Sequence, residues 1–428
     1  LIFVQGRGGS GKTWLMKRLI AEIRAREGIA QVCAATGLAA TLYLHGTTAH
    51  SLFKVPVEDE ADLEDEEHEL KCKLDENGDR MELLKATNLI VWDEFPNNHR
   101  NTFEAIYRAM NGFENQILVA CGDFRQIPPV VPGSDKWAVV DASVKSSPLW
   151  HKFKVFELTV AHRHASDPQY AAFVQNLGEG VLGEDLRYPD ERGTPIANAR
   201  VVPLQFVRAF SERAMDEAIN FVYPDLANVL SLPDRAILAA TNELVDEWNS
   251  TIQQKRCQLE ITAAGARPNT GVVHDLLSAD ILTECDDENG HIRRMLTTEF
   301  LNGLNRPGVP PHKLQLSIGD ICIIMRNLNK KDGLTNNRRV VVLTIQPFSV
   351  KVQTIGPHPK VFALPRIRFK FRLPHGSFEV MRTQFPLRLA YCMTYNKSQG
   401  QELQAVLVDL RSPPFTHGHL YVALSRVR

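Results

Sequence analysis

Residues 6–13 read GRGGSGKT, and this motif constrains the chain more than any other feature. It fits the pattern GxxxxGK(S/T), follows the apolar run Leu1 to Val4, and opens a stretch predicted to be helical from Lys12 to about Glu27. Glycines allow backbone N–H groups to curl around phosphate oxygens, and the N-terminus of the helix adds the positive end of its dipole. The sequence therefore predicts a strand, loop and helix that hold the phosphates of a nucleotide.

The residues of this loop take separate roles in the prediction. Lys12 pairs with the β- and γ-phosphates of ATP, and the Thr13 hydroxyl is a ligand of Mg²⁺. ATP and Mg²⁺ are thus the expected cofactors. The remaining residues expected to cradle the nucleotide are Gly6, Gly8, Gly9, Ser10 and Gly11.

Two acidic residues follow the apolar strand expected at Leu89 to Trp92. The end of that strand places Asp93 at the carboxyl edge of the sheet, where it holds the metal ion beside the phosphate loop. Glu94 is then positioned to orient or deprotonate the attacking water. A third strand, expected at Gln116 to Ala120, ends shortly before Gln126, which we predict to sense the γ-phosphate.

Two arginines beyond the first α/β half suggest a motor rather than a kinase. Arg163 follows a strand that ends near Leu158, and Arg426 lies in LYVALSRV. Phosphoryl transfer needs positive charge on the γ-phosphate, and arginine fingers supply it. Fingers from a second domain make closure of the cleft depend on the γ-phosphate, so hydrolysis reopens the cleft.

The pattern of apolar runs predicts how the 428 residues are organised. A chain of this length is expected to form two or three domains. Short apolar runs that alternate with helical stretches predict an α/β fold with parallel sheets, and a β-branched, Pro- and Gly-rich region predicts an inserted β-barrel. The predicted boundaries are 1–56 and 82–157 for the first α/β domain, 57–81 for a small acidic insertion in it, 158–313 and 387–428 for the second, and 314–386 for the β insertion in the second.

Bulk composition limits the function classes. The formal net charge of −1 argues against nucleic-acid binding through overall positive charge, so such binding must use local patches. One candidate is Arg366 to Arg372, which alternates basic with apolar residues and is either a DNA contact or a charged edge strand. The seven cysteines form no CxxC pair, which favours reduced thiols in a cytosolic or nuclear protein. No signal peptide or membrane-spanning run is found, and the first and last residues suggest a fragment of a longer protein.

The order of motifs resembles that of superfamily 1 DNA helicases of the B subgroup, close to the Pif (petite integration frequency) family and its relatives in helitron transposons. The matching stretches are GRGGSGKT, AATGLAATL, GTTAHSLF, VWDEF, CGDFRQIPPVVPGS, SSPLW, FELTVAHRH, AATNELVDEWN, GLTNNRRVVV, MTYNKSQGQEL and THGHLYVALSRV. This resemblance implies two RecA-like P-loop NTPase domains in tandem, a pin-like insertion in the first and an SH3-like β-barrel in the second.

The resemblance also implies a function and further site residues. The expected activity is ATP hydrolysis coupled to movement along single-stranded DNA, 5′ to 3′, with unwinding of duplex. Expected partners are single-stranded DNA and junctions of duplex with single strand, and no membrane. The protein is expected to be monomeric or weakly associating, and to lie in the nucleus, with mitochondria as a second location, or in the cytoplasm if it is bacterial. The expected processes are DNA repair, recombination, telomere maintenance or transposon maintenance. The resemblance places Gly400 and Glu402 near the nucleotide ribose. It assigns DNA contacts to Thr36, Gly37, His50, Thr394, Lys397 and Ser398, with His417 as a weaker candidate.

Two points stay open from sequence. An aromatic ring, Phe124 or Tyr395, is a candidate for stacking on a base. The alternative function is that of a degenerate nucleic-acid-binding remnant of a mobile element with a dead ATPase. The intact Lys12, Asp93 and Glu94 argue against that alternative.

Overall fold

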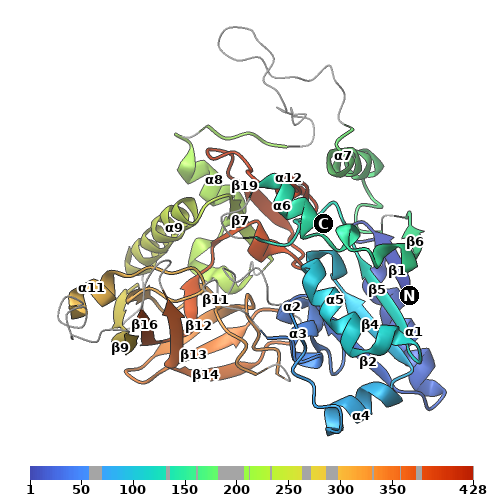
Figure 1. Cartoon of the computed structure of the whole chain (residues 1–428). Helices are drawn as coiled ribbons and strands as arrows, with labels where there is room; N and C mark the ends of the chain where they lie inside the picture. The colour runs from blue at the N-terminus through green and yellow to red at the C-terminus, as the bar shows by residue number, and fades with distance from the viewer. Residues whose placement is uncertain are drawn as a thin grey trace.

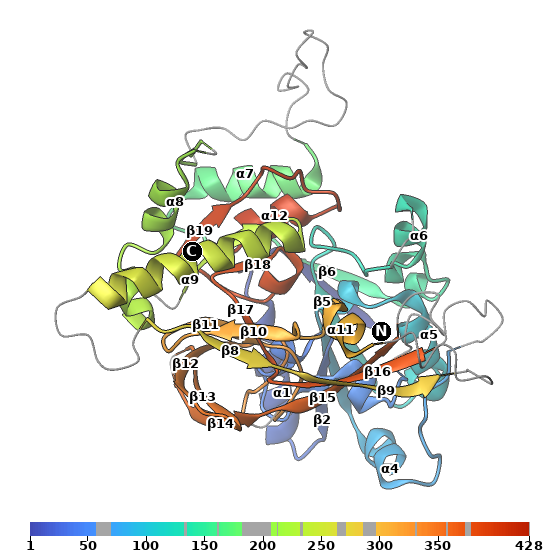
Figure 2. The same ribbon diagram turned by 90° about the vertical axis from the view of Figure 1, so that its left-hand side faces the viewer.

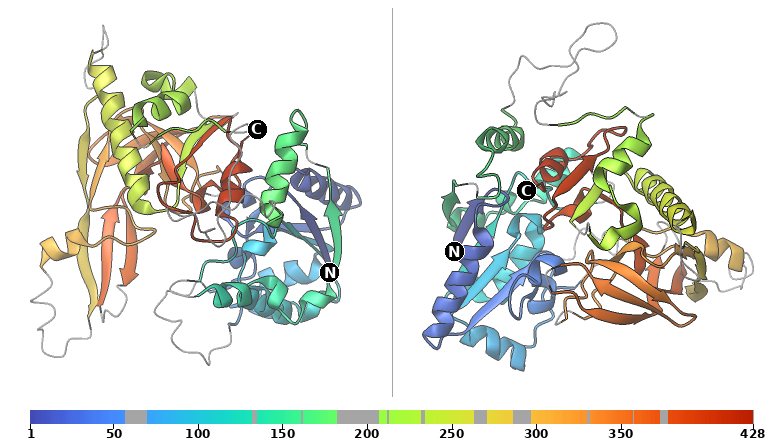
Figure 3. Two further views of the ribbon diagram at one scale, coloured as in Figure 1. Left: turned by 90° about the horizontal axis from the view of Figure 1, so that it is seen from above. Right: turned by 180° about the vertical axis from the view of Figure 1, so that it is seen from behind.

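Two α/β lobes and a β-rich insertion make up the molecule, which is described here from a computed structural model (Figure 1). Figure 3 shows the lobes side by side, with the β-rich insertion on the side of the second lobe. The structure describes residues 1–56, 70–131, 135–160, 162–181, 207–211, 213–231, 234–262, 271–285, 297–329, 332–356, 358–372 and 378–427.

The first lobe is built on a six-stranded sheet with the order β3-β2-β4-β5-β1-β6. All its neighbouring strands are parallel. The inner strands of the sheet are mostly buried, which is why continuous apolar runs located them in the sequence. The edge strand β6 is mostly exposed. The strands are β1 (Ile2–Gly6), β2 (Ala30–Ala34), β3 (Thr47–Thr48), β4 (Leu89–Asp93), β5 (Ile117–Gly122) and β6 (Lys154–Leu158).

Helices cover both faces of this sheet. On one face, α1 (Lys12–Ala25) buries Met16 and Ile20 against the strands. On the other face, Phe103 and Ile106 of α5 join a second core that includes Trp92. The helices of this lobe are α1, α2 (Gly37–Ala40), α3 (Ala49–Leu52), α4 (Asp79–Ala86), α5 (Arg100–Ala109) and α6 (Lys136–Asp141).

The acidic insertion predicted at 57–81 is described only in part, because residues 57–69 lie outside the described residues. The backbone N–H of Lys73 donates to the Lys54 carbonyl at 2.9 Å, so the chain returns close to the point where it left. Leu70 and Leu74 then pack on the core of the first lobe. Whether the insertion acts as a pin stays a prediction.

The second lobe has a smaller parallel sheet with the order β18-β7-β19. Its core joins Trp248 and Ile252 of the long helix α9 to Ile219 of α8. The elements are α7 (Pro168–Glu179), α8 (Met215–Val222), β7 (Arg235–Ala239), α9 (Asn242–Thr262), β18 (Cys392–Thr394), β19 (Ala405–Val408) and α12 (His419–Leu424).

The β-rich insertion contains a five-stranded sheet with the order β14-β13-β12-β11-β17, in which all neighbouring strands are antiparallel. Its strands are β11 (Ile321–Ile324), β12 (Arg339–Ile345), β13 (Ser349–Thr354), β14 (Val361–Pro365) and β17 (Leu387–Leu389). In Figure 2 these strands curve beneath α9. The SH3-like form of this unit remains a prediction from resemblance.

The β region begins earlier than the predicted position 314. The strand β8 (His274–Leu277) pairs with β10 (Lys313–Leu316), and β9 (Ala279–Cys285) pairs with β16 (Phe378–Gln384). Strand pairing is non-local, so these short strands gave no sign of their partners in the sequence. The remaining elements are β15 (Ile367–Arg372), which pairs with β16, and α11 (Thr298–Gly303).

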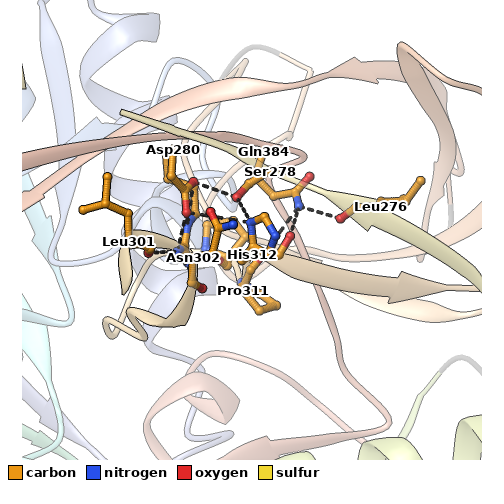
Figure 4. A network of polar contacts seen from close by, with 10 residues as sticks. Leu276, Ser278, Asp280, Leu301, Asn302, Pro311, His312 and Gln384 are labelled. Carbon is orange, nitrogen blue, oxygen red and sulfur yellow. Dashed lines mark hydrogen bonds and ion pairs between the residues drawn. The ribbon is translucent and has the colours of Figure 1, made fainter. Parts of the chain in front are cut away.

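A buried network of polar contacts fastens this outer sheet, and Figure 4 shows Asp280, His312 and Gln384 within it. Nη2 of Arg382 in β16 lies 2.7 Å from Oδ2 of Asp280 in β9, and neither side chain is exposed. The same guanidinium donates to the carbonyls of Pro310 and Leu301, so the strand pair is joined to α11. A buried guanidinium of this kind needs hydrogen-bond partners for its donors. Removing either member of the ion pair leaves the other charge buried and unpaired, which destabilises the fold. We assign the network a structural role.

Strand β15 has the two faces that its alternation predicts. Phe369 and Phe371 are buried, whereas Arg368, Lys370 and Arg372 are exposed. The strand lies at an edge of its sheet. Burial does not distinguish a DNA contact from a charged edge, so both interpretations stand.

Two expectations from composition concern membrane-spanning helices and the state of the cysteines. No helix among the described residues has both the length and the apolarity to cross a bilayer. Six cysteines are free thiols, and the side chain of Cys285 lies outside the described residues.

Candidate nucleotide and nucleic-acid site

The phosphate loop lies between β1 and α1, as predicted. Gly9 and Gly11 have φ values of 77° and 88°, a left-handed conformation that strains other residues. The ammonium group of Lys12 donates to the carbonyl oxygens of Gly6 and Arg7, at 2.5 and 3.0 Å. Lys12 is therefore directed at the loop that would surround a phosphate.

Asp93 and Glu94 stand at the carboxyl end of β4, beside this loop. Oδ1 of Asp93 accepts from the Glu94 N–H at 2.8 Å and from the Cys121 thiol at 3.1 Å. Its Oδ2 accepts from the hydroxyl of Tyr43 at 2.7 Å. Glu94 has a φ of 51°, which is uncommon for a residue with a side chain and often marks functional sites. Glu94 Oε2 is buried and has no hydrogen-bond partner in the protein.

The electrostatics of Glu94 suit a general base. Burial raises its pKa to about 7, and the neighbouring Asp93 charge acts in the same direction. Lys12 and Arg426 oppose the shift. A carboxyl group whose pKa lies near neutral pH is able both to take and to release a proton during catalysis.

Arg163 and Arg426 lie over the phosphate loop. A Cβ atom placed on Gly8 would lie 3.2 Å from Nη1 of Arg163 and 3.9 Å from Nη2 of Arg426. The backbone N–H of His162 also donates to the Gly9 carbonyl at 3.0 Å. Burial lowers the pKa of Arg426 to about 10, and the positive charge of Arg163 adds to that effect. Two cations held close together in a buried site are well placed to meet the negative charge of a triphosphate.

The guanidinium of Arg163 already has partners in the second lobe. Its Nη1 donates to the Ser425 carbonyl at 2.8 Å, and its Nη2 donates to Oε1 of Glu402 at 2.5 Å. Glu402 was predicted to approach the ribose, and here it forms an ion pair with the predicted finger. Gly400, the other predicted ribose neighbour, packs near Leu38 of the first lobe.

Gln126 lies at the junction of the lobes. Its side chain is buried, and its Oε1 has no partner in the protein. A Cβ atom placed on Gly418, directly before α12, would lie 2.6 Å from the carbonyl carbon of Gln126. Close to this contact, the hydroxyl of Tyr421 in α12 donates to Oδ2 of Asp123 at 2.6 Å. The predicted sensor thus belongs to a segment that the second lobe touches directly.

These residues fit ATP with Mg²⁺. The side-chain atoms Ser10 Oγ, Glu94 Oε2, Gln126 Oε1 and Arg163 Nε are buried without partners, as expected of groups that serve a ligand. Among the described residues no group of three His, Cys, Asp or Glu forms a metal site. Mg²⁺ in NTPases is held by one or two protein oxygens together with phosphates and waters. Thr13 and Asp93 match that requirement.

The predicted DNA residues lie on both lobes. The Thr36 hydroxyl caps α2, accepting from the Ala39 N–H at 3.2 Å. Gly37 packs against Asn327 and Thr335 of the β insertion. Burial lowers the pKa of His50, which keeps the ring neutral. The first lobe therefore presents polar groups without added charge.

On the second lobe, Thr394 ends β18, and Lys397 and Ser398 follow in a 3₁₀ turn, Asn396–Ser398. Burial lowers the pKa of Lys397 to about 8, and the nearby Arg388 acts in the same direction. The Ser398 hydroxyl is buried and donates to the Tyr395 carbonyl at 2.7 Å, so it is turned away from solvent. His417 is exposed.

The two aromatic candidates are packing residues. Tyr395 is wholly buried and its hydroxyl donates to the Asp409 carbonyl at 3.0 Å, so the stacking interpretation of Tyr395 is wrong. Phe124 packs on Phe3 and Trp150, with ring centroids 5.2 and 5.4 Å away. Both residues stand among polar residues in the sequence, which did not reveal that their rings pack in a core.

Tyr43, Asp123 and Tyr421 were missed by sequence reasoning. Tyr421 and Asp123 are 298 residues apart in the chain, and Tyr43 and Asp93 are 50 apart. Tyrosines within apolar stretches look like core residues. The available signal was that a buried tyrosine hydroxyl usually finds a partner.

The fold and the site together define a class: a two-lobed P-loop NTPase with RecA-like lobes, in which arginines of the second lobe reach the phosphate loop of the first. The family model described as PIF1-like helicase matches residues 1–184, and the model of the 2B domain of DNA helicase Pif1 matches residues 299–345.

Relatives match along the whole chain. The chain is 25% identical over 439 residues to the ATP-dependent DNA helicase PIF1 of Danio rerio, covering 100% of this chain and 57% of the relative. It is 25% identical over 447 residues to the ATP-dependent DNA helicase Pif1 of Campylobacter jejuni, covering 99% and 86%. The chain thus spans little more than half of the zebrafish relative. Residues 1–184 and 299–345 thus match models of Pif1 helicases, and the similarity to curated Pif1 helicases extends along the whole chain.

Solved structures agree on the fold. The Pif1 helicase from Bacteroides in complex with ADP-AlF3 and ssDNA aligns with a TM-score of 0.63 at 20% identity, covering 100% of this chain and 86% of that one. The Pif1 helicase from Candida albicans aligns with a TM-score of 0.58 at 22% identity, covering 100% and 89%. The prediction of tandem RecA-like domains is confirmed.

Proposed function

We propose that this chain is the motor of an ATP-dependent DNA helicase, which hydrolyses ATP with Mg²⁺ and moves along single-stranded DNA. The observation that carries the proposal is the meeting of Arg163 and Arg426 with the phosphate loop around Gly8. A P-loop alone suits many kinases and switches. Arginines supplied by a second lobe of the same chain make the state of the nucleotide a property of the cleft between the lobes.

In the proposed reaction the chain's residues divide the work. Bound ATP supplies the γ-phosphoryl group, and bound Mg²⁺ offsets the charge on its oxygens. Lys12 leaves the carbonyls of its own loop to pair with phosphate oxygens, and Glu94 accepts the proton of the attacking water. Arg163 and Arg426 stabilise the charge that develops in the transition state.

We propose that ATP hydrolysis is coupled to movement on DNA through the contacts between the two lobes. Gln126 and Asp123 of the first lobe contact the segment of Gly418 and Tyr421 in the second. When the arginines lose the γ-phosphate, this contact is the one that yields. The polar groups at Thr36 and those after β18 lie on opposite lobes, so a change in closure alters their spacing along a strand. Such contacts bind phosphate without reading sequence.

The name of the zebrafish relative and the Bacteroides complex with ssDNA support the choice of DNA as the track. We extend the proposal to 5′-to-3′ movement and to unwinding of duplex at single-strand junctions. The acidic insertion predicted at 57–81 is the proposed strand separator. No sequence preference is expected, because phosphate contacts dominate the predicted interface.

ATPase activity tests this function directly. We expect single-stranded DNA to stimulate ATP hydrolysis strongly, and Lys12→Ala to abolish it while leaving the fold intact by circular dichroism. Equal turnover with and without DNA contradicts the motor proposal. If the wild-type chain hydrolyses ATP no faster than Lys12→Ala does, the chain is a remnant with a dead ATPase site. Strand displacement on substrates with 5′ or 3′ overhangs then reports polarity and unwinding together.

A further inference from the structure

Tyr43 lies beneath the predicted metal site, and no role has been assigned to it. The residue follows α2, and its side chain is 5% exposed. Its ring packs with Met16 and Ile20 of α1 and with Val91 of β4. This packing fixes the ring, and the hydroxyl is the part of the side chain that meets polar groups.

The hydroxyl of Tyr43 holds one of the predicted metal ligands. It donates to Oδ2 of Asp93 at 2.7 Å. The Asp93 carboxylate is buried as well, with 3% of the residue exposed. The hydrogen bond is therefore shielded from water, and it fixes one oxygen of the carboxylate.

The other oxygen of Asp93 is also held. It accepts from the N–H of Glu94 and from the thiol of Cys121, so the carboxylate is oriented on both sides. Partners of metal ligands orient them and tune the affinity for the ion.

We propose that Tyr43 is a positioning residue for magnesium, which orients the Asp93 carboxylate toward the metal ion of a bound Mg²⁺–nucleotide. This inference rests on the proposed nucleotide site. It does not require DNA binding or unwinding.

The test separates the metal from the nucleotide. Tyr43→Phe keeps the ring and removes the hydroxyl. A fluorescent ADP analogue is titrated into the full chain in EDTA and in a series of Mg²⁺ concentrations. We expect unchanged affinity in EDTA, and a Mg²⁺ concentration for half-maximal tightening that rises about 10- to 100-fold, the range for loss of a partner of a metal ligand. Tyr223→Phe is the matched control, because its buried hydroxyl donates to the Tyr391 carbonyl at 2.7 Å in the second lobe.

A second variant distinguishes positioning from a general loss of packing. In Asp93→Asn, adding Tyr43→Phe should change the Mg²⁺ dependence no further, because the two residues act on one ion. If Tyr43→Phe weakens binding equally in EDTA and Mg²⁺, or leaves the Mg²⁺ dependence unchanged while the wild type shows one, the inference is overturned and the proposed function stands. If the wild-type chain binds no nucleotide, both fail.

Discussion

Replacing Tyr421 by Phe removes one hydroxyl at the junction of the lobes and leaves the ring in place. Tyr421 is 3% exposed, and its hydroxyl donates to Oδ2 of the buried Asp123 at 2.6 Å. Arg125 holds the other oxygen of that carboxylate at 2.8 Å. The carboxylate therefore keeps one charged partner in the variant and loses the hydrogen bond that reaches it from α12.

The magnitude follows from the kind of bond. A hydrogen bond to a charged group contributes about 1.5–3 kcal/mol. Since this bond joins the lobes, its loss is expected to shift the equilibrium of lobe closure toward the open form by about 10- to 150-fold. Because the bond to Asp123 joins the two lobes, the main effect of its loss is expected on kcat.

The assay combines turnover with a distance. Dyes on the two lobes report closure by energy transfer when a non-hydrolysed ATP analogue is added, and kcat is measured with single-stranded DNA. We expect both to fall in Tyr421→Phe. Tyr170→Phe is the control, since its hydroxyl donates to the Leu424 carbonyl at 2.9 Å without crossing to the first lobe. Unchanged closure and unchanged kcat in Tyr421→Phe would refute the reasoning.

Three further predictions concern the same cleft. Burial raises the pKa of Glu94 to about 7, so kcat should rise as the pH increases through 7. A pH profile of kcat that is flat from pH 6 to 8 contradicts the role of Glu94 as base. The same carboxyl group stabilises the fold below its unfolded pKa near 4.5, and that contribution is lost as the pH rises toward 7. Gly418→Ala places a Cβ 2.6 Å from the Gln126 backbone at a φ of +79°, so it should block closure and lower kcat, whereas Gly303→Ala, with nothing within 4 Å, should not. Glu402→Gln removes the charged partner of Arg163, and basal ATP turnover at saturating ATP should rise by at most about fivefold, the worth of a partly exposed ion pair; unchanged or lower turnover argues against a holding role.

The sequence located the phosphate loop and its strands because their signals are local. A strand buried on both faces must be apolar throughout, and a phosphate loop needs glycines at fixed positions. The strand predicted at Leu89 to Trp92 and the acidic pair after it agree with β4 for that reason. The same logic placed Arg163 and Arg426 in a second lobe.

Long-range partners were beyond prediction. The pairing of β9 with β16 joins segments separated by most of the β insertion, and neither strand's composition names the other. The pairing of Arg163 with Glu402 likewise joins residues 239 positions apart in the chain. Tyr395 shows the opposite error, because its place in a motif suggested a surface role that its burial excludes.

The sheet of the second lobe has a consequence for how the chain folds. Its central strand, β7, ends at Ala239, yet both neighbours, β18 and β19, come about 150 residues later, after the β insertion. On a ribosome the first lobe is complete long before β7 finds a partner, and the exposed apolar strand must wait. If the insertion folds first, it brings the chain segments on either side of it closer together. Pairing of β7 with β18 and β19 then costs less conformational entropy. The outer β module would then act as a folding aid for the lobe whose sequence it interrupts, and destabilising the module should slow refolding of that lobe.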